Sequence, residues 1–324
     1  MLPRIVVLAA PRRADAMSSS RLSLRAGLPS LAFVLIWSTG FIVGRAIVPV
    51  AQPSLFLLAR FALAALLFAL VAVAGGARWP ALREVPKHLL AGALLHGSYL
   101  CGGYWAVAHG LPPAAMALLG ALQPVLTALL AIPLLGEFPS RRGWGGLALG
   151  SLGVILVVAP AMLASVSHPV SPWVLLVALL SILSITVGTI LQKTSIAAAD
   201  LRASSAWQNT GGALVAGTLA WLLGETHWQP GLALWSALAW AALVLSGAGT
   251  YLLLRIVRRG QAATAASLMF LAPPLAALQA WLLFGDKLGL LQLLGLAVAG
   301  LGVWLCQTGQ PARPPQRTGH AAAR

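Results

Sequence analysis

Ten long apolar runs, separated by short polar loops, make up most of the chain. Their limits, to within a few residues, are 28–48, 54–74, 88–109, 113–135, 143–160, 173–193, 204–224, 234–255, 262–284 and 289–306. An α-helix needs about 20 apolar residues to cross a hydrocarbon core roughly 30 Å thick. Every run reaches or nearly reaches that length, so the pattern predicts an all-α membrane protein with ten transmembrane helices.

The composition also indicates a lipid environment. Of the 324 residues, 59% are hydrophobic and only 8% are charged, whereas about 25% of the residues of a typical soluble chain are charged. So few charges cannot cover the surface of a soluble domain of this length. The net charge of +15 would suggest nucleic acid in a soluble protein, but here the cations lie in loops between apolar runs. We therefore expect the lipid bilayer as a partner and no nucleic acid.

The distribution of Lys and Arg predicts the orientation. If the N-terminus is cytoplasmic, 18 of the 21 cations fall in tails and loops on the cytoplasmic side. Short loops rich in Lys and Arg stay in the cytoplasm, so we expect both termini there, in the cell inner (plasma) membrane. Residues 1–27 would form a cytoplasmic tail, with translation starting at Met1 or Met17. Residues 308–324, rich in Pro and Arg, would form a disordered cytoplasmic tail.

The second half of the chain repeats the first. Residues 114–157 align without gaps on residues 263–306, with 18 of 44 positions identical at an offset of 149. The matched positions include the pairs Pro124 with Pro273, Gly136 with Gly285 and Gly153 with Gly302. Five helices are an odd number, so the two repeats, predicted at 28–160 and 173–307, would cross the membrane in opposite directions. Inverted five-helix repeats of this kind are typical of secondary transporters.

Several of these segments resemble a known family. Residues 36–45 (IWSTGFIVGR) and 58–61 (LARF) resemble the first two helices of EamA-like members of the drug/metabolite transporter (DMT) superfamily. So do the two Pro-x11-Gly-acid signatures, at residues 124–137 and 273–286, each followed by a Gly-rich helix. The resemblance implies two EamA-type domains, with helices 1–4 and 6–9 around a central cavity and helices 5 and 10 outside it. It also implies an exporter of amino acids or related metabolites. Asp286 departs from the family, which usually has Glu there.

The chain carries no motif of an enzyme or a primary pump. It lacks GxSxG, HExxH and Walker sequences, and its six acids all fall at predicted helix ends or in loops and tails. No two acids are placed for paired acid–base catalysis, so we expect no enzyme activity, no cofactor and no metal. Proton-coupled carriers commonly place a carboxylate at mid-membrane. None is predicted here, which disfavours a cation/proton antiporter.

Arg60 is the one cation placed well inside an apolar run. It lies seven residues after Pro53, about 10 Å along the second helix. In one interpretation its guanidinium attracts the carboxylate of a substrate; in the other it extends to the membrane surface or binds backbone carbonyls. Asn209 occupies the matching position in the second repeat, so one repeat would supply a charge and the other a hydrogen-bonding group.

Other polar or aromatic side chains at membrane depth are candidates for the same site. His96 is either a hydrogen-bonded packing residue or a pH-sensitive switch, and Tyr99 shares its helix face. Buried amides need partners in lipid, so the remaining candidates either hold helices together or contact substrate. They are Trp37, Gln123, Gln208, Tyr251 and Gln279.

Glu137 and Asp286 each precede a Gly-rich helix, where a carboxylate suits the helix N-terminus. We expect them to cap these helices, with gating at opposite membrane faces as the alternative. The glycines of helices 5 and 10 permit close helix packing, within the chain or in a homodimer.

These observations predict a secondary transporter that exports small metabolites such as amino acids by alternating access at a central site. Two alternatives stay open. One is an exporter of drugs or other lipophilic compounds in the same superfamily, and the other is a non-transporting membrane scaffold.

Overall fold

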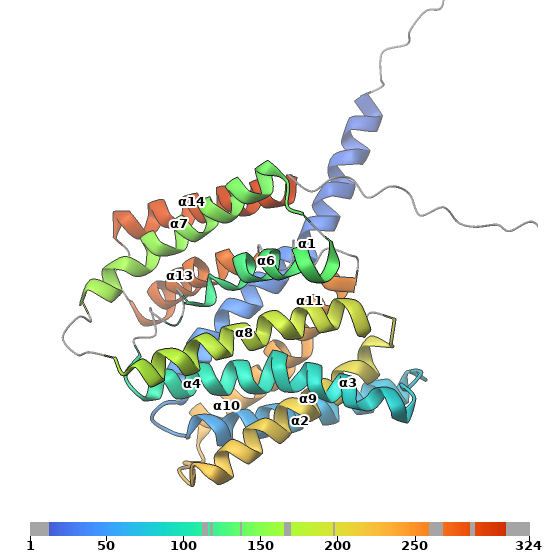
Figure 1. Cartoon of the computed structure of the whole chain (residues 1–324), viewed down its shortest axis with the longest axis vertical. Coiled ribbons are helices and arrows are strands. Elements are labelled where there is room, and N and C mark those ends of the chain that lie inside the picture. The colour runs from blue at the N-terminus through green and yellow to red at the C-terminus, as the bar shows by residue number, and fades with distance from the viewer. Residues whose placement is uncertain are drawn as a thin grey trace, which may run out of the picture.

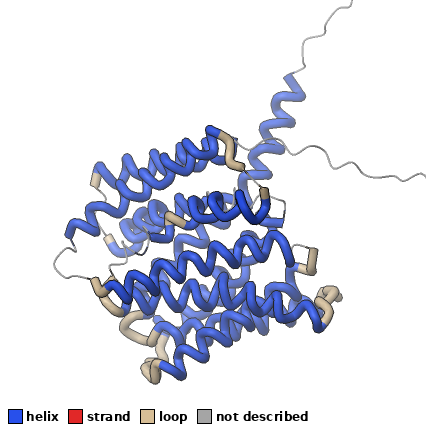
Figure 2. The backbone as a smooth tube through the Cα atoms, in the orientation of Figure 1, coloured by secondary structure: helices blue, strands red, loops and turns tan. Residues whose placement is uncertain are grey.

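The computed structural model describes residues 13–111, 116, 119–136, 138–164, 170–196, 198–258, 268–285 and 289–308. Helices account for nearly all of this part of the chain (Figure 1, Figure 2). In order, they are α1 (Arg13–Ile47), α2 (Pro53–Ala74), η1 (Leu82–Glu84), α3 (Val85–Gly92), η2 (Ala93–Ser98), α4 (Tyr99–Ala108), α6 (Gln123–Leu135), α7 (Arg141–Ala164), α8 (Pro172–Ser195), α9 (Leu201–Leu222), α10 (Leu232–Ala239), η3 (Trp240–Gly249), α11 (Thr250–Arg258), η4 (Met269–Leu271), α13 (Ala272–Phe284) and α14 (Leu290–Thr308). Among the described residues no strand forms, and one isolated bridge joins Ala51 to Trp228.

The helices confirm an all-α, multi-pass membrane protein. Within the described ranges, five segments are long and apolar enough to cross a bilayer. They are Leu28–Ile47, Pro53–Ala74, Arg141–Pro160, Pro172–Thr194 and Leu232–Leu253. Three shorter apolar helices lie at Gln123–Leu135, Met269–Leu283 and Leu290–Cys306. The helix α1 begins at Arg13 and so runs through much of the segment predicted to be an N-terminal tail.

Two helix pairs form opposite edges of the bundle (Figure 1). The pair α7 and α14 lies along one edge, and the pair α2 and α9 lies along the other, with the remaining helices between them. In each edge pair, one helix comes from the first half of the chain and its equivalent comes from the second half. The position of α7 and α14 agrees with the peripheral place that the sequence resemblance implies for helices 5 and 10.

The contacts between the other helices repeat when the two halves are exchanged. In the first half α1 packs against α13 and η3, and in the second half its equivalent α8 packs against α6, η2 and α4. The internal sequence repeat is therefore matched by a repeated packing arrangement.

Glycines allow α7 and α14 to touch backbone to backbone. A Cβ atom at Gly153 would overlap the backbone nitrogen of Ala299, and one at Gly302 would overlap that of Gly150. A Cβ at Gly146 would lie 2.6 Å from the backbone nitrogen of Cys306. Early residues of α7 thus meet late residues of α14, so the two equivalent helices run antiparallel. These glycines pack helices within the chain, while a homodimer through α7 and α14 stays a prediction.

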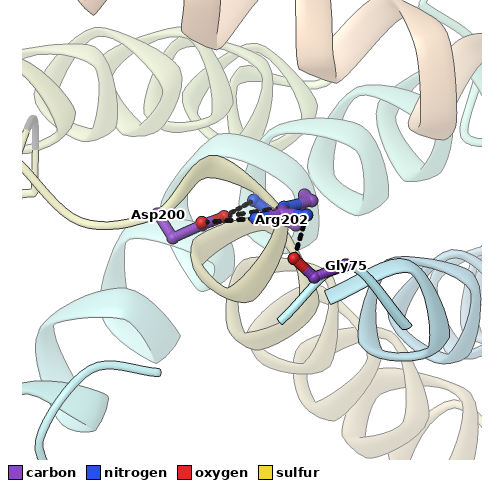
Figure 3. A network of polar contacts seen from close by, with 3 residues as sticks. All are labelled: Gly75, Asp200 and Arg202. Atoms are coloured by element: carbon purple, nitrogen blue, oxygen red, sulfur yellow. Dashed lines mark hydrogen bonds and ion pairs between the residues drawn. The ribbon is translucent and has the colours of Figure 1, made fainter. Parts of the chain in front are cut away.

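Polar contacts hold both ends of the α2–α9 pair. At one end Asp200 accepts hydrogen bonds from the backbone and the guanidinium of Arg202, whose Nη1 also donates to the carbonyl of Gly75 at 3.1 Å (Figure 3). A Cβ atom at position 75 would overlap that guanidinium. Donation by Arg202 holds the pKa of the Asp200 carboxyl below its ordinary value. Asp200 therefore caps α9 in its ionised form, and this contact weakens only in acid, as pH falls through the lowered pKa.

The opposite end of the pair is held mainly by backbone groups. Glu225 accepts a hydrogen bond from the backbone nitrogen of Leu55 at 2.9 Å, in the first turn of α2. The side chain of Gln52 accepts from the backbone nitrogens of Thr226 and His227 at 2.6 and 2.7 Å. Each half of the chain thus satisfies donors of the other at this end.

The α7–α14 contact predicts that two glycines of α7 differ in how strongly their replacement by alanine changes stability. Gly153→Ala should lower the free energy of unfolding by about 1–3 kcal/mol, because its methyl group has no room against α14. A Cβ atom at Gly145 would meet nothing within 4 Å, so Gly145→Ala should leave stability unchanged or slightly raised. Thermal unfolding of the purified protein in detergent measures both. Equal melting temperatures for the two variants would contradict the close packing of α7 on α14.

Candidate functional site

Arg60 lies inside the bundle and does not extend to its surface. The side chain is only 6% exposed, on the part of α2 that packs against α9 and η3. Its Nε atom donates a hydrogen bond to the hydroxyl Oγ of Ser246 at 2.8 Å. Ser246 is itself 2% exposed, so the bond is shielded from water. Because the polar end of Arg60 is held by a buried group, the snorkelling interpretation does not describe this side chain.

Ser246 belongs to a π-helical segment that has an equivalent in the other repeat. The segment η3 joins α10 to α11, and the segment η2 joins α3 to α4 in the same way. π-Helical turns are rare and often occur at functional sites, because they change the direction in which side chains point. Here η3 carries Ser246 and η2 carries His96. Both irregular segments therefore bring a polar group to the side of the bundle where α2 and α9 meet.

Neutral groups surround the guanidinium of Arg60. Its central carbon lies 5.5 Å from the centroid of the Phe61 ring, within cation–π range. Tyr104 packs against the apolar cluster that contains Phe61. Arg60 forms no ion pair with any acid that the structure describes. Of these acids, Glu84, Asp200 and Glu225 lie at the ends of helices.

This arrangement leaves a buried positive charge without a counterion among the described residues. An isolated charge taken out of water costs several kcal/mol unless an opposite charge or several hydrogen bonds compensate it. Ser246 supplies one hydrogen bond, through Nε. The terminal amino groups of Arg60 have no hydrogen-bond partner in the described part of the chain. The site is therefore suited to an anion.

His96 and Asn209 lie on elements that pack against Phe61, the residue next to Arg60, and each has an unpaired atom. The His96 ring lies 5.9 Å from the Phe61 ring, and its Cβ lies 3.1 Å from where a Cβ of Gly212 would be. Asn209 precedes Gly212 by three residues on α9, and its amide nitrogen donates to the carbonyl of Ser205 at 2.9 Å. Within the described structure, His96 Nε2 and Asn209 Oδ1 are buried and unpartnered. Each is available to hydrogen-bond a bound molecule or water.

A second buried polar cluster lies where α3, α8 and α9 meet. His88 Nδ1 is 3.0 Å from the hydroxyl of Ser204, which also accepts from the Gln208 amide at 2.9 Å. The same Gln208 amide donates to Gln192 Oε1 at 2.7 Å. Gly92 makes room for it, since a Cβ there would overlap the Gln208 backbone. We call His88, Gln192, Ser204 and Gln208 the polar seam.

The polar seam has an apolar counterpart at the other end of the bundle. At the repeat offset of 149, its four positions correspond to Ala237, Val43, Leu55 and Ala59. Val43 belongs to a buried apolar cluster of α1, α2, α10 and η3, and Ala59 and Ala237 pack against that cluster. The two repeats thus share a backbone arrangement, but equivalent positions are polar at one end of the bundle and apolar at the other.

The other predicted site residues pack elsewhere in the bundle or lie outside the described residues. Trp37 is half-buried, with its ring 5.4 Å from Phe33 in an apolar cluster near α7 and α14. The Gln279 amide donates to the carbonyl of Leu35 at 3.1 Å, which ties α13 to α1. Gln123 is buried in the first turn of α6, and Tyr251 is 37% exposed on α11. Glu137 and Asp286 lie outside the described residues, so their capping or gating roles stay predictions.

Of the predicted set, the structure thus places Arg60, His96 and Asn209 on elements that meet around Phe61, with Tyr99 three residues after His96 at the start of α4. Gln208, also predicted, belongs to the polar seam. Sequence reasoning missed Ser246, His88 and Gln192. A serine inside an apolar run gives no signal by itself. His88 and Gln192 lie at the ends of the predicted runs 88–109 and 173–193, beside Lys87 and Lys193, where polar residues are expected.

Comparison with known proteins gives a family and a fold. The sequence profile described as the EamA-like transporter family matches residues 27–159 and again residues 172–307. A solved crystal structure, described only as that of a protein, is similar to this chain with a TM-score of 0.73 and 20% sequence identity. The similarity covers 88% of this chain and 96% of that chain, and at this identity it shows the fold alone. No curated protein matches the chain.

Proposed function

Because the chain belongs to the EamA-like transporter family, within the DMT superfamily, we propose that it is a secondary carrier for small metabolites that bear a carboxylate. Amino acids are the expected substrates, moved out of the cell by alternating access. The observation that carries the proposal is the buried guanidinium of Arg60, which has no counterion among the described residues. A substrate carboxylate would supply the missing negative charge.

The packing of equivalent helices supports alternating access. In our proposal ten helices cross the inner membrane as two inverted five-helix repeats, with both termini in the cytoplasm. Equivalent helices meet antiparallel at both edges of the bundle: Gly217 of α9 packs on Leu58 near the start of α2, and Arg202 packs on Gly75 just after its end. Inverted repeats can exchange conformations, so that a central site opens first to one side and then to the other.

The geometry of Arg60 favours a carboxylate. A guanidinium presents parallel N–H groups that match the two oxygens of a carboxylate, and such charge-assisted bonds are about twice as strong as neutral ones. With Nε engaged by Ser246, the two terminal amino groups are left to bind the substrate. The ammonium group of an amino acid would bind a neutral acceptor, and the unpartnered Asn209 Oδ1 is a suitable one.

The same charge disfavours the alternative of a lipophilic-cation exporter. A cationic drug would have to bind near Arg60 without a described acid to offset the repulsion between like charges. A non-transporting scaffold would show no saturable exchange of either class of compound.

Substitution of Arg60 tests the substrate proposal. Arg60→Ala should weaken exchange of carboxylate-bearing substrates by about 30- to several-thousand-fold in affinity, because a truncated buried charge contact typically costs about 2–5 kcal/mol. Arg60→Lys should keep partial activity, since it retains the charge but loses the paired N–H groups that bind both oxygens of a carboxylate. Counterflow of each of the twenty radiolabelled L-amino acids into liposomes measures the effect, with Arg78→Ala, at an exposed residue, as the control.

Three outcomes would contradict this proposal. A well-folded Arg60→Ala protein that exchanges amino acids with unchanged affinity would show that Arg60 does not bind substrate. A wild-type protein that exchanges none of the twenty, but exchanges a lipophilic cation such as tetraphenylphosphonium, would favour the drug exporter. No saturable exchange of either class would favour the scaffold.

The proposed orientation is tested with reporter fusions. An enzyme that is active only in the cytoplasm, fused after Arg142 or after Arg259, should be active, because these loops carry clustered arginines. A periplasm-specific reporter should be active when fused at the loop that contains Gln229. The reverse pattern at either kind of loop would overturn the topology.

A further inference from the structure

We propose that Ser246 is a positioning residue for Arg60 and, through it, sets the preference of the site for carboxylates over neutral groups. The proposal rests on the proposed function, because it assumes that Arg60 binds the substrate. It starts from one contact, the 2.8 Å hydrogen bond from Arg60 Nε to Ser246 Oγ, in which both side chains are buried.

The guanidinium of an arginine is planar and can bind a carboxylate in two ways. In the side-on mode the carboxylate bridges Nε and one terminal nitrogen, and in the end-on mode it bridges both terminal nitrogens. A hydrogen bond from Nε to Ser246 occupies the side-on edge. The end-on edge, Nη1 and Nη2, has no hydrogen-bond partner among the residues that the structure describes. Ser246 thus selects one of the two binding modes.

The same bond fixes the direction of that free edge. A long side chain such as Arg loses rotamer entropy when it is ordered, and a site that is ordered before binding avoids that loss when substrate arrives. Without Ser246, Nε would be a donor with no hydrogen-bond partner among the described residues, and nothing in that part of the chain would hold the guanidinium in one orientation. The guanidinium would then no longer present a single edge.

Ser246 comes from the opposite repeat to Arg60. Arg60 is on α2 of the first repeat, and Ser246 is 186 residues away, in the π-helical η3 of the second. At the repeat offset of 149, the equivalent position in η2 is Gly97, which has no side chain to take this role. The site is therefore complete only when α2 and η3 are packed together, and η3 determines how Arg60 is aimed.

The test compares serine variants in liposomes. Ser246→Ala removes the acceptor, and Ser246→Cys keeps the size of the side chain but leaves a weak acceptor. Ser181→Ala is the matched control, because Ser181 is equally buried at 2% exposed and its hydroxyl bonds within its own helix, to the carbonyl of Ala178. The probes are the amino acid that the wild type exchanges fastest among the twenty, and the carboxamide of that amino acid.

We expect Ser246→Ala to raise the KM for the amino acid by about 10- to 100-fold, the usual consequence of losing a hydrogen bond to a charged group. Its maximal rate should stay within about threefold of wild type, and its preference for the amino acid over the carboxamide should fall. Ser246→Cys should lie between Ser246→Ala and wild type, and Ser181→Ala should match wild type.

The outcomes separate this proposal from the proposed function. If Arg60→Ala abolishes exchange while Ser246→Ala keeps the wild-type KM and preference, Arg60 binds substrate without help from Ser246 and the positioning role is wrong. A lower maximal rate with unchanged KM and preference would also overturn it, because Ser246 would then act only in the conformational change. If Arg60→Ala is fully active, or no amino acid is exchanged, the proposed function fails and this inference fails with it.

Discussion

In a hydrocarbon environment, a polar group must find its partner inside the protein, and the interior of this bundle follows from that constraint. Arg60 follows it only in part. Its Nε, on α2, donates to the hydroxyl of Ser246 in η3 at 2.8 Å, while its terminal amino groups have no hydrogen-bond partner among the described residues. The contact fixes the facing sides of α2 and η3, and with them the position of the only cation whose side chain is buried among the described residues.

Helix packing in lipid also depends on how closely backbones approach, because lipid tails compete equally for apolar side chains. Glycine allows this close approach at two helix–helix contacts. At the α7–α14 edge, Gly153 and Gly302 place backbone against backbone. Between α3 and α9, Gly92 makes room for the backbone of Gln208, whose side chain then joins the polar seam. Close backbone approach therefore serves packing alone between α7 and α14, whereas between α3 and α9 it also supports a hydrogen-bonded cluster.

The sequence could predict the helices, because apolar runs depend on local composition. It could also predict the internal repeat, because that repeat appears as identical residues 149 positions apart. It could also single out Arg60, since a cation in an apolar run is costly wherever its side chain points. It could not predict Ser246, because a small hydroxyl can bond to its own helix, as Ser181 does to Ala178. Which serine meets a partner depends on the rotation of each helix, and the π-helical turn in η3 changes that rotation. Gln123 and Gln208 are both glutamines within apolar runs, and the sequence could not predict that only the second joins the polar seam.

The polar seam and its apolar counterpart have a consequence for temperature. If the two ends of the bundle open in turn, parting the apolar cluster around Val43 and Leu245 exposes hydrocarbon surface to water, which raises the heat capacity. Parting the seam of His88, Ser204 and Gln208 exposes mainly polar groups, and exposed polar surface lowers it. The enthalpy difference between the two open states would then change with temperature, so the balance between them would not follow a straight van't Hoff line. Two repeats built on one backbone plan would thus give a carrier whose two faces respond differently to warming.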